Sequence, residues 1–329
     1  MPSIKDQAMS VMITGGTGFL GAEICRLLVE DGQRPVLLDP YPPRGRLREL
    51  QGHFTYAAGS LTNLPVLLNT VRHYEVDTVY HLGGMLSLPS EEDPWNAFEV
   101  NVVGTYNALE ACRLSGIGKM IFASSIAVFG EGITGEVITD DTLQRPASFY
   151  GAGKVFSELQ GRFYARRFGL DFRGLRVPSV VGPGSRVAHM TIYNCWAIEH
   201  PLRGLPYRVP VGPETRCPTI YYKDAAQAFF MLAKADAASI KSKVYNVAGQ
   251  SPAYTAAQLV EAVRGHLPQA DLSIDPDPNI SRLLQGLSRL ALDDGPARRE
   301  WGWRPSFDLE QMVADFVAEF RAHPDVYSL

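Results

Sequence analysis

The sequence VMITGGTGFLGAEICRLL, residues 11–28, decides the fold, because it joins an apolar strand to an amphipathic helix through a glycine-rich turn. Each glycine has an expected role. Gly15 allows the tight turn, Gly18 lets the backbone approach a pyrophosphate, and Gly21 lets the helix pack closely on the sheet. The free N–H groups and the positive dipole end of the helix favour phosphate. This stretch therefore predicts a dinucleotide-binding site.

Asp39 supports that site, since it ends the second predicted strand about twenty residues after the glycines. Its carboxylate can accept hydrogen bonds from the adenosine ribose and would repel a 2′-phosphate, which favours NAD over NADP. Two alternatives stay open. Arg44 and Arg46 follow in the next loop and could reach a phosphate, and Asp39 can be a turn residue before Pro40.

Short apolar runs alternate with amphipathic segments, which is typical of a parallel sheet covered by helices on both faces. The predicted strands are residues 11–14, 35–39, 54–58, 78–81, 120–124, 172–177 and 244–248. The predicted helices are residues 20–30, 97–113, 149–167, 255–266 and 309–321. Right-handed crossovers then give an α/β fold, a Rossmann-like doubly wound parallel sheet.

After Pro178 the chain becomes rich in Pro, Gly and Arg, as in HPLRGLPYRVPVGPETRCP at residues 200–218. This change predicts a smaller C-terminal substrate-binding lobe, interleaved with the last elements of the sheet. We therefore expect residues 1–178 to bind NAD and residues 179–329 to bind substrate.

The segment YGAGK places Tyr150 and Lys154 four residues apart, on one face of a predicted helix. A lysine ammonium near a phenol favours the phenolate, so Tyr150 is expected to exchange a proton with a substrate hydroxyl near neutral pH. Ser125 ends the strand IFASS at the edge of the sheet where cofactors bind, and is expected to hydrogen-bond the reacting oxygen. Ser124 is the alternative, and the two neighbours should point in opposite directions.

Composition favours a small-molecule partner. The net charge of −4 and the pI of about 6.0 give no broad basic field for nucleic acid or a membrane surface. The four cysteines lie far apart and no histidine cluster accompanies them, so we expect idle thiols and no metal site. The first residues, MPSIKDQAMS, lack the layout of a signal peptide, and no apolar stretch is long enough to span a bilayer. We expect a cytoplasmic protein.

Several motifs together resemble the extended, epimerase-like branch of the short-chain dehydrogenase/reductase superfamily, over nearly the whole chain. They are TGGTGFLG, Asp39, HLGG at residues 81–84, Asn101, SSIAVFG and YGAGK. The resemblance implies a Rossmann domain that holds NAD near a Ser, Tyr and Lys triad, here Ser125, Tyr150 and Lys154. Lys154 would also bind the nicotinamide ribose.

The expected cofactor-binding residues are Gly15, Thr17, Gly18, Phe19, Leu20, Asp39, Leu61, Leu82, Gly83, Tyr150, Lys154 and Pro178. Gly83 and Gly84 replace the alanines common in the family. Ser60 stands where many members carry an aspartate near the adenine.

The substrate-binding stretch departs from the nucleotide-sugar enzymes of this branch. Ser179 occupies the position of their diphosphate-binding asparagine, and Arg216 is one residue too far from Asp224 to match their arginine. HLGGMLS, PTIYYKDA and ARREWGWRPSFDL instead resemble the short-chain-type threonine dehydrogenases, and residues 200–216 resemble the related sugar-acid dehydrogenases. By that resemblance Ser87 approaches the substrate, together with Ser125 and Ser179.

Arg186 is expected to pair with a substrate carboxylate, because a guanidinium fits that anion bidentately. These features predict an NAD-dependent dehydrogenase of a small polar hydroxy acid, acting as a homodimer. A nucleotide-sugar 4-epimerase or dehydratase with tightly bound NAD is the main alternative. A catalytically silent NAD sensor is a third.

Four further residues are expected to be structural. His81 should be a packed histidine, and Asn101 should tie its helix to the neighbouring strand. Trp301 and Trp303 should pack the C-terminal helix.

Overall fold

The structure, a computed structural model, describes residues 10–130, 132–133, 135–187, 189, 191–285 and 291–327. Its centre is a seven-stranded sheet in which every neighbouring pair of strands is parallel. In spatial order the strands are β11 (Val244–Asn246), β7 (Asp171–Val177), β5 (Lys119–Ser125), β4 (Thr78–His81), β1 (Val11–Thr14), β2 (Val36–Asp39) and β3 (Thr55–Ala58). The predicted doubly wound α/β fold is confirmed.

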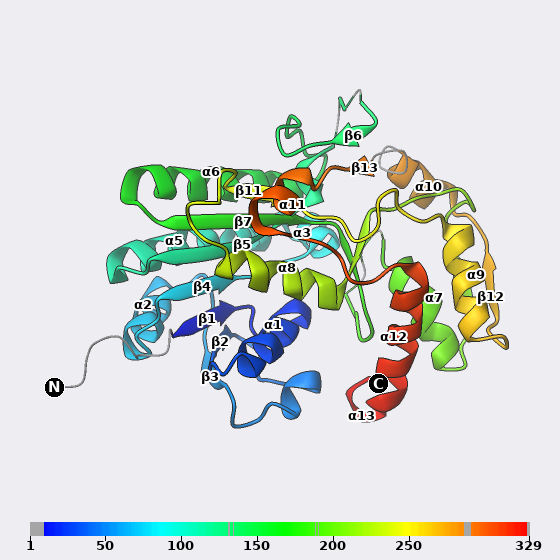
Figure 1. Ribbon diagram of the computed structural model, residues 1–329, viewed down its shortest axis with the longest axis horizontal. Coiled ribbons are helices and arrows are strands. Elements are labelled where there is room, and N and C mark those ends of the chain that lie inside the picture. Colours follow the sequence, from blue (N-terminus) through cyan, green and yellow to red (C-terminus); the bar gives the residue numbers. More distant parts are fainter. Residues whose placement is uncertain are drawn as a thin grey trace.

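The strand order reverses at β1, which lies between β4 and β2. A crevice forms at the carboxyl ends of the strands at such a switch point, and it is where ligands bind in open α/β sheets. Helices cover both faces of the sheet, as Figure 1 shows. They are α1 (Phe19–Glu30) and α8 (Tyr222–Lys234) on one face, and α2 (Leu64–His73), α5 (Gly104–Ser115) and α6 (Phe149–Phe168) on the other.

The single helix expected at residues 97–113 is three consecutive elements. α4 (Pro94–Ala97) leads into a π-helix, η2 (Phe98–Val103), which continues as α5. A π-helix is rare and often lies at a functional site. Here it carries Asn101, whose amide exchanges two hydrogen bonds with the backbone of Met85, at 2.7 and 3.1 Å. Asn101 therefore fixes the segment that follows β4, close to the role expected of it.

The C-terminal part of the chain forms a lobe beside the sheet (Figure 1). Its helices α7 (Tyr193–Leu202), α9 (Ala256–His266) and α12 (Leu309–Ala322) share one hydrophobic core. Around them lie α10 (Pro278–Gln285), α13 (Pro324–Tyr327), and the paired strands β8 (Ser179–Val181) with β10 (Thr219–Tyr221) and β9 (Tyr207–Val209) with β12 (Leu272–Ile274). α8 and β11 return to the sheet, so the lobe is interleaved with it.

Shorter elements complete the chain. They are α3 (Ser87–Glu92), α11 (Gly295–Trp301), the 3-10 turns η1 (Gly45–Arg48) and η3 (Ile126–Val128), and the strand pair β6 (Val137–Ile138) with β13 (Ala291–Leu292). Within the described parts of the chain, no helix has both the length and the apolar character needed to cross a membrane.

The position of Trp301 and Trp303 differs from expectation. Both belong to the core that fills the space between the sheet, α1 and α8, and the Trp301 ring centre lies 5.8 Å from that of Tyr245 on β11. α12 packs in the separate core of the lobe. The prediction was wrong because proximity in sequence to α12 does not determine which core a side chain enters.

Candidate active site

The glycine-rich turn at residues 15–21 has no room for side chains. Gly15 has a left-handed φ of 67°, and a Cβ there would lie 2.7 Å from the backbone of Gly83. A Cβ on Gly21 would lie 2.3 Å from the carbonyl oxygen of Gly15, so only glycine lets α1 begin this close to β1. Gly18 precedes α1 without a side-chain cap, which leaves the N–H groups of the first turn available to a phosphate. The residues present fit a dinucleotide.

The carboxylate of Asp39 lies at the end of β2 and is buried against this turn. One oxygen accepts a hydrogen bond from the Thr17 N–H at 3.2 Å, and the other accepts one from the Tyr41 N–H at 3.0 Å. Asp39 thus has two roles in the backbone around it. It borders the cofactor turn, and it closes a local turn two residues on.

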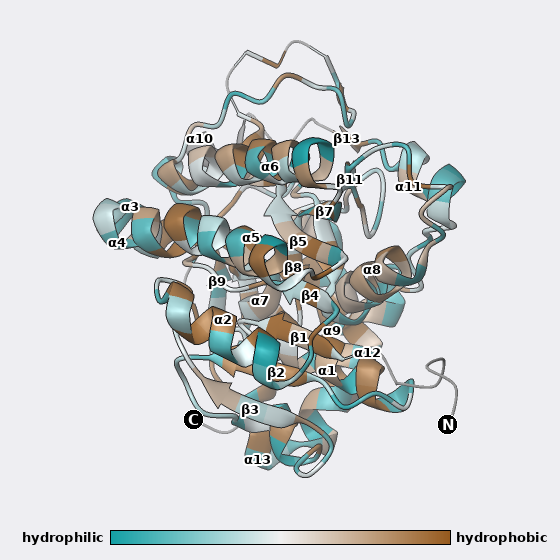
Figure 2. Cartoon of the chain, turned by 90° about the vertical axis from the view of Figure 1, so that its left-hand side faces the viewer, coloured by the Kyte–Doolittle hydropathy of each residue, from teal (hydrophilic) through white to brown (hydrophobic). Residues whose placement is uncertain are grey.

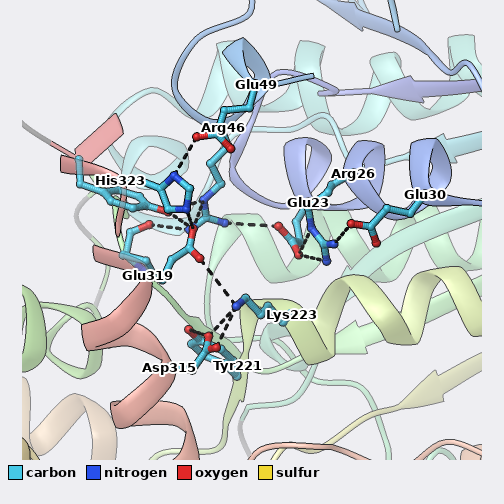
Figure 3. Close-up of polar contacts among 12 residues, drawn as sticks. Glu23, Arg26, Glu30, Arg46, Glu49, Tyr221, Lys223, Asp315, Glu319 and His323 are labelled. Atoms are coloured by element: carbon cyan, nitrogen blue, oxygen red, sulfur yellow. Dashed lines mark hydrogen bonds and ion pairs between the residues drawn. The ribbon is translucent and has the colours of Figure 1, made fainter. Parts of the chain in front are cut away.

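Arg46, one of the two arginines that could reach a phosphate, has its partners inside the protein. Its Nε donates to the hydroxyl of Tyr327 at 2.6 Å, and its guanidinium lies between Glu23 of α1 and Glu319 of α12 (Figure 3). These partners engage the guanidinium within the protein. Arg44 is exposed.

Leu61, Leu82 and Gly83 line up beside the turn, as expected of a cofactor wall. A Cβ on Gly83 would lie 2.8 Å from Leu61 Cδ1, and the Leu82 N–H donates to the Thr14 carbonyl at 3.1 Å. The Thr14 hydroxyl contacts His81 Nδ1 at 2.8 Å. His81 is buried, its Nε2 lies 3.1 Å from the Thr105 hydroxyl, and it is the packed histidine that was predicted. Ser60 contacts the Thr62 hydroxyl at 2.9 Å within the same loop.

The structure brings Ser125, Tyr150 and Lys154 together at the carboxyl edge of the sheet. Tyr150 and Lys154 lie one turn apart on α6, with the Lys154 Nζ 5.6 Å from the centre of the Tyr150 ring. Lys154 Nζ donates to the Ala123 carbonyl of β5 at 2.7 Å. Ser125 ends β5, and its hydroxyl interacts with that of Tyr150. Ser124 points the other way, toward Glu158 at 2.5 Å.

The protonation of this pair differs from the expectation that Lys154 lowers the pKa of Tyr150. Burial raises the pKa of Tyr150 to about 12, and the Ser125 hydroxyl only partly opposes that rise. Burial also lowers the pKa of Lys154 to about 8, against the opposing charge of Glu158. Desolvation is the largest cause of the pKa shift at each residue, so burial opposes the effect that the spacing predicts. The ammonium also points to the Ala123 carbonyl.

A buried ion pair behind the triad escaped the sequence analysis. Glu158 lies one turn beyond Lys154 on α6 and pairs with Arg176 of β7 at 2.8 Å. Its carboxylate also accepts hydrogen bonds from Ser124 and from Gln144, the latter at 2.8 Å. The signal was present in the sequence, since YGAGKVFSE repeats the four-residue spacing of Tyr150 and Lys154 once more.

The serines expected to contact the substrate lie on elements that neighbour those carrying the triad. Ser87 begins α3, and α3 packs on α6 where Glu91 accepts a hydrogen bond from the Phe149 N–H at 2.7 Å. Ser179 follows the buried Pro178, which comes directly after β7. The last residue of β7, Val177, pairs with Ser125. The Ser179 hydroxyl accepts a hydrogen bond from Thr191 at 2.7 Å, and Thr191 contacts His189 at 3.0 Å.

Arg186 and Arg216 are directed elsewhere. One amino group of Arg186 donates to the carbonyl oxygen of Tyr327 at 3.1 Å, so this side chain is oriented to the C-terminal turn α13. The expectation that Arg186 pairs with a substrate carboxylate gains no support from this orientation. Arg216 donates to the carbonyl of Ala253, and Asp224 accepts hydrogen bonds from the N–H groups of Ser306 and Phe307. Neither residue is arranged as a diphosphate anchor.

Comparison with known proteins agrees with this geometry. Residues 11–248 match the model of the NAD dependent epimerase/dehydratase family. The chain is 29% identical to the mitochondrial L-threonine 3-dehydrogenase of Sus scrofa over 96% of its own length and 84% of that protein.

Two solved structures are similar over almost their full length. The L-threonine dehydrogenase from Cupriavidus necator in its holo form has a TM-score of 0.86 and 28% identity, with 94% of this chain and 99% of that chain covered. The UDP-glucose 4-epimerase of Thermus thermophilus in complex with NAD has a TM-score of 0.80 and 27% identity, with 95% and 99% covered.

These matches identify the protein as an NAD-dependent enzyme of the extended short-chain dehydrogenase/reductase type. The match of the family model spans all seven strands of the central sheet and part of the lobe. The chain belongs to the NAD dependent epimerase/dehydratase family, the extended branch of the short-chain dehydrogenases/reductases.

Proposed function

We propose that this enzyme oxidises a small polar hydroxy acid, of the threonine or sugar-acid kind, at its hydroxyl-bearing carbon. The observation that carries the proposal is the meeting of Ser125, Tyr150 and Lys154 beside the glycine-rich turn. Two features argue against a nucleotide diphosphate as part of the substrate. Arg216 is oriented to the Ala253 carbonyl, and Ser179 stands where nucleotide-sugar enzymes carry an asparagine. Similarity to threonine dehydrogenases supports the same class.

In the proposed mechanism Tyr150 takes the proton of the substrate hydroxyl, and Ser125 hydrogen-bonds the same oxygen. Bound NAD supplies the hydride acceptor. Gly15, Thr17, Gly18, Phe19, Leu20, Asp39, Leu61, Leu82, Gly83 and Pro178 would hold it, and Tyr150 and Lys154 would contact its nicotinamide end. Lys154 stands beside the Tyr150 ring, where its ammonium stabilises the phenolate form of Tyr150 that accepts the substrate proton.

The test of the substrate class is NADH absorbance with a panel of L-threonine, four-carbon sugar acids and UDP-glucose. A hydroxy acid dehydrogenase accumulates NADH with one of the acids and none with UDP-glucose. Interconversion of the nucleotide sugar without net NADH would establish the epimerase instead. Ser87 and Ser179 are the proposed substrate contacts, and Ser179→Asn tests whether an asparagine there brings activity toward the nucleotide sugar.

We predict that kcat/KM for oxidation rises about tenfold per pH unit up to about pH 8 and is then flat. The reactive state has a Tyr150 phenolate and a Lys154 ammonium, one proton fewer than the fully protonated pair. The pair loses its first proton near the pKa of Lys154, about 8, and above that pH the fraction in the reactive state stays constant until about 12. A pH profile of initial rates checks this. A rise that continues well beyond pH 9 would show that Lys154 does not share the proton.

Asp39 is the proposed determinant of cofactor preference. We predict that Asp39→Ala weakens NAD binding about tenfold or more, because a hydrogen bond to a charged group is worth about 1.5–3 kcal/mol. NADP binding should improve, since the repulsion of a 2′-phosphate is removed. Calorimetric Kd values for both cofactors measure the ratio. Asp31→Ala, which removes a carboxylate at the other end of α1, is the control. An unchanged ratio would leave Asp39 the role of a turn residue.

We also propose a homodimer through α5 and α6. Figure 2 looks onto these two helices, and hydrophobic segments are visible along both. Five large apolar side chains on them are between 43% and 56% exposed, a cluster that marks an interaction surface. They are Tyr106, Phe156, Leu159, Phe163 and Phe168. A second copy of the same face covers them when the two copies are related by a two-fold axis.

Leu159→Glu is predicted to give a monomer. A two-fold axis brings the new carboxylate near its own copy, and like charges across an interface cost several kcal/mol. Light scattering on the purified protein measures the molecular mass. Leu205→Glu is the matched control, because Leu205 is also about half exposed, at 46%, but lies beyond α7. Equal masses for the two variants would contradict the proposed interface.

A reducing compartment such as the cytoplasm is the proposed location. All four cysteines are buried free thiols, and burial raises the pKa of each to about 12. Such thiols are unreactive structural residues. We also propose that the chain divides at residue 178 into an NAD-binding part and a substrate-binding part. All the proposed cofactor-binding residues, from Gly15 to Pro178, belong to the first part.

A further inference from the structure

Arg46 joins segments that border the cofactor site to segments of the lobe. It lies in η1, the helical turn that follows β2 and Asp39. Its Nε donates to the Tyr327 hydroxyl at 2.6 Å, and one amino group donates to the Pro183 carbonyl at 3.2 Å. The other amino group lies 3.7 Å from Glu23 of α1. One side chain therefore contacts the cofactor part, the loop after β8 and the last turn of the described chain.

Three aromatic rings surround the same guanidinium. Its central carbon lies 4.0 Å from the ring centre of Tyr222 and 5.4 Å from those of Phe19 and Tyr327. An arginine over aromatic faces at these distances makes cation–π interactions. Phe19 is the first residue of α1 and part of the glycine-rich segment, so Arg46 contacts the helix N-terminus at which the pyrophosphate is expected.

Tyr327 completes the connection from the lobe. Its ring is buried, and its hydroxyl donates to Glu319 of α12 at 2.9 Å while accepting from Arg46. Its carbonyl oxygen accepts hydrogen bonds from Arg186 and Arg203. A Cβ on Gly184 would lie 3.0 Å from the Tyr327 ring, so the loop after β8 packs directly on this turn.

The same loop is also fixed from the side of α7. Glu199 pairs with Arg203 at 2.7 Å and accepts a hydrogen bond from the Gly184 N–H at 2.9 Å. Figure 3 shows Arg46 at the centre of the arrangement, with α1 on one side and the C-terminal helices on the other. The loop at residues 182–187 leaves β8, which carries Ser179, and so it connects this arrangement to the substrate side of the triad.

We propose that Arg46 is a positioning residue, and that it forms with Tyr327 a C-terminal clasp that holds the glycine-rich segment against the loop at residues 182–187. NAD that binds at Phe19 is then coupled, through Arg46, to the order of the loop on the substrate side. The proposal rests on the use of NAD and on no particular substrate. If Arg46 only stabilised the fold, its substitution would leave the effect of NAD on the loop at residues 182–187 unchanged.

The experiment measures two quantities in the absence of substrate, so its failure is distinguishable from failure of the proposed function. One is the Kd of NAD by calorimetry. The other is amide hydrogen exchange of residues 182–187 with and without NAD. In the wild type we expect NAD to slow exchange in this loop. In Arg46→Gln we expect NAD binding about tenfold weaker, a moderate coupling, and no protection of the loop.

Arg48→Gln is the matched control, because Arg48 is an exposed arginine on the same turn. It should behave as the wild type in both measurements. Tyr327→Phe keeps the ring but removes the hydroxyl that joins Arg46 to Glu319, and should reproduce both effects in weaker form. If Arg46→Gln does not fold, Tyr327→Phe decides by the same two readouts. Unchanged NAD affinity, or loop protection by NAD that persists in the variant, would overturn the proposal.

Discussion

Tyr150→Phe is expected to lower kcat/KM by about 10²- to 10⁴-fold, the range that general acid–base catalysis contributes. The change removes one hydroxyl and keeps the ring, so the packing on α6 and the Lys154 ammonium at 5.6 Å from the ring centre are retained. NAD affinity should therefore stay nearly unchanged. Initial rates of NADH formation and the Kd of NAD, measured on the same preparation, separate loss of chemistry from loss of binding.

The matched control is Tyr164→Phe, on the same helix. Its hydroxyl donates to Glu110 of α5, far along α6 from the triad, so its loss should leave the rate unaffected. If Tyr150→Phe retains turnover close to that of the control, the proton must leave through another group. Ser125 would be that group, because its hydroxyl already interacts with the phenol.

The N-terminal site could be predicted because its residues act through local backbone geometry. The strand at residues 11–14 is found with the bounds predicted, and Gly15 adopts the left-handed φ that the turn needs. The four-residue spacing of Tyr150 and Lys154 also depends only on the helix that carries them. Such features involve neighbours in sequence, and a single chain displays them.

The directions of the arginines could not be predicted, because their partners are distant in sequence. Arg46 and Arg186 both bind Tyr327, which lies at the other end of the chain. From the sequence alone, an arginine can be expected to bind a phosphate, a carboxylate, a carbonyl or an aromatic face. The fold decides among them, and here it assigns both cations to the C-terminal turn. The same limit applied to Trp301 and Trp303.

The pKa of Tyr150 shows a second limit. Sequence spacing places a cation near the phenol, which by itself favours the phenolate. Burial acts against both charges and is the larger effect here, giving pKa values of about 12 for Tyr150 and about 8 for Lys154. Burial is a property of the assembled fold, so the spacing could place the two side chains on one face of α6 but could not give the direction of the pKa shift.

Glu158→Ala is the substitution expected to cost the most stability, about 3–5 kcal/mol, as is typical when one partner of a buried ion pair is removed. The side chains of Arg176 and Glu158 are only 3% and 1% exposed, so the guanidinium would be left buried without its counter-charge. Ser124 and Gln144 would lose their acceptor as well. Denaturant unfolding measures the difference. The control is Asp271→Ala, which breaks an exposed pair with Arg208 and should cost at most about 1 kcal/mol.

The double variant Glu158→Leu with Arg176→Met separates the structural role of this pair from its effect on the reaction. Replacing both charges by apolar side chains should recover most of the lost stability, because no unpaired charge remains buried. The charge that raises the pKa of Lys154 is nevertheless absent. Neither His81 nor Tyr150 supplies a negative charge in its place, because a histidine is neutral or cationic and Tyr150 stays protonated. The pKa of Lys154 should therefore fall, and the flat region of the kcat/KM profile should begin at a lower pH than in the wild type. A stable double variant whose profile is unchanged would show that Glu158 supports the fold of α6 and has no influence on the proton that Tyr150 and Lys154 share.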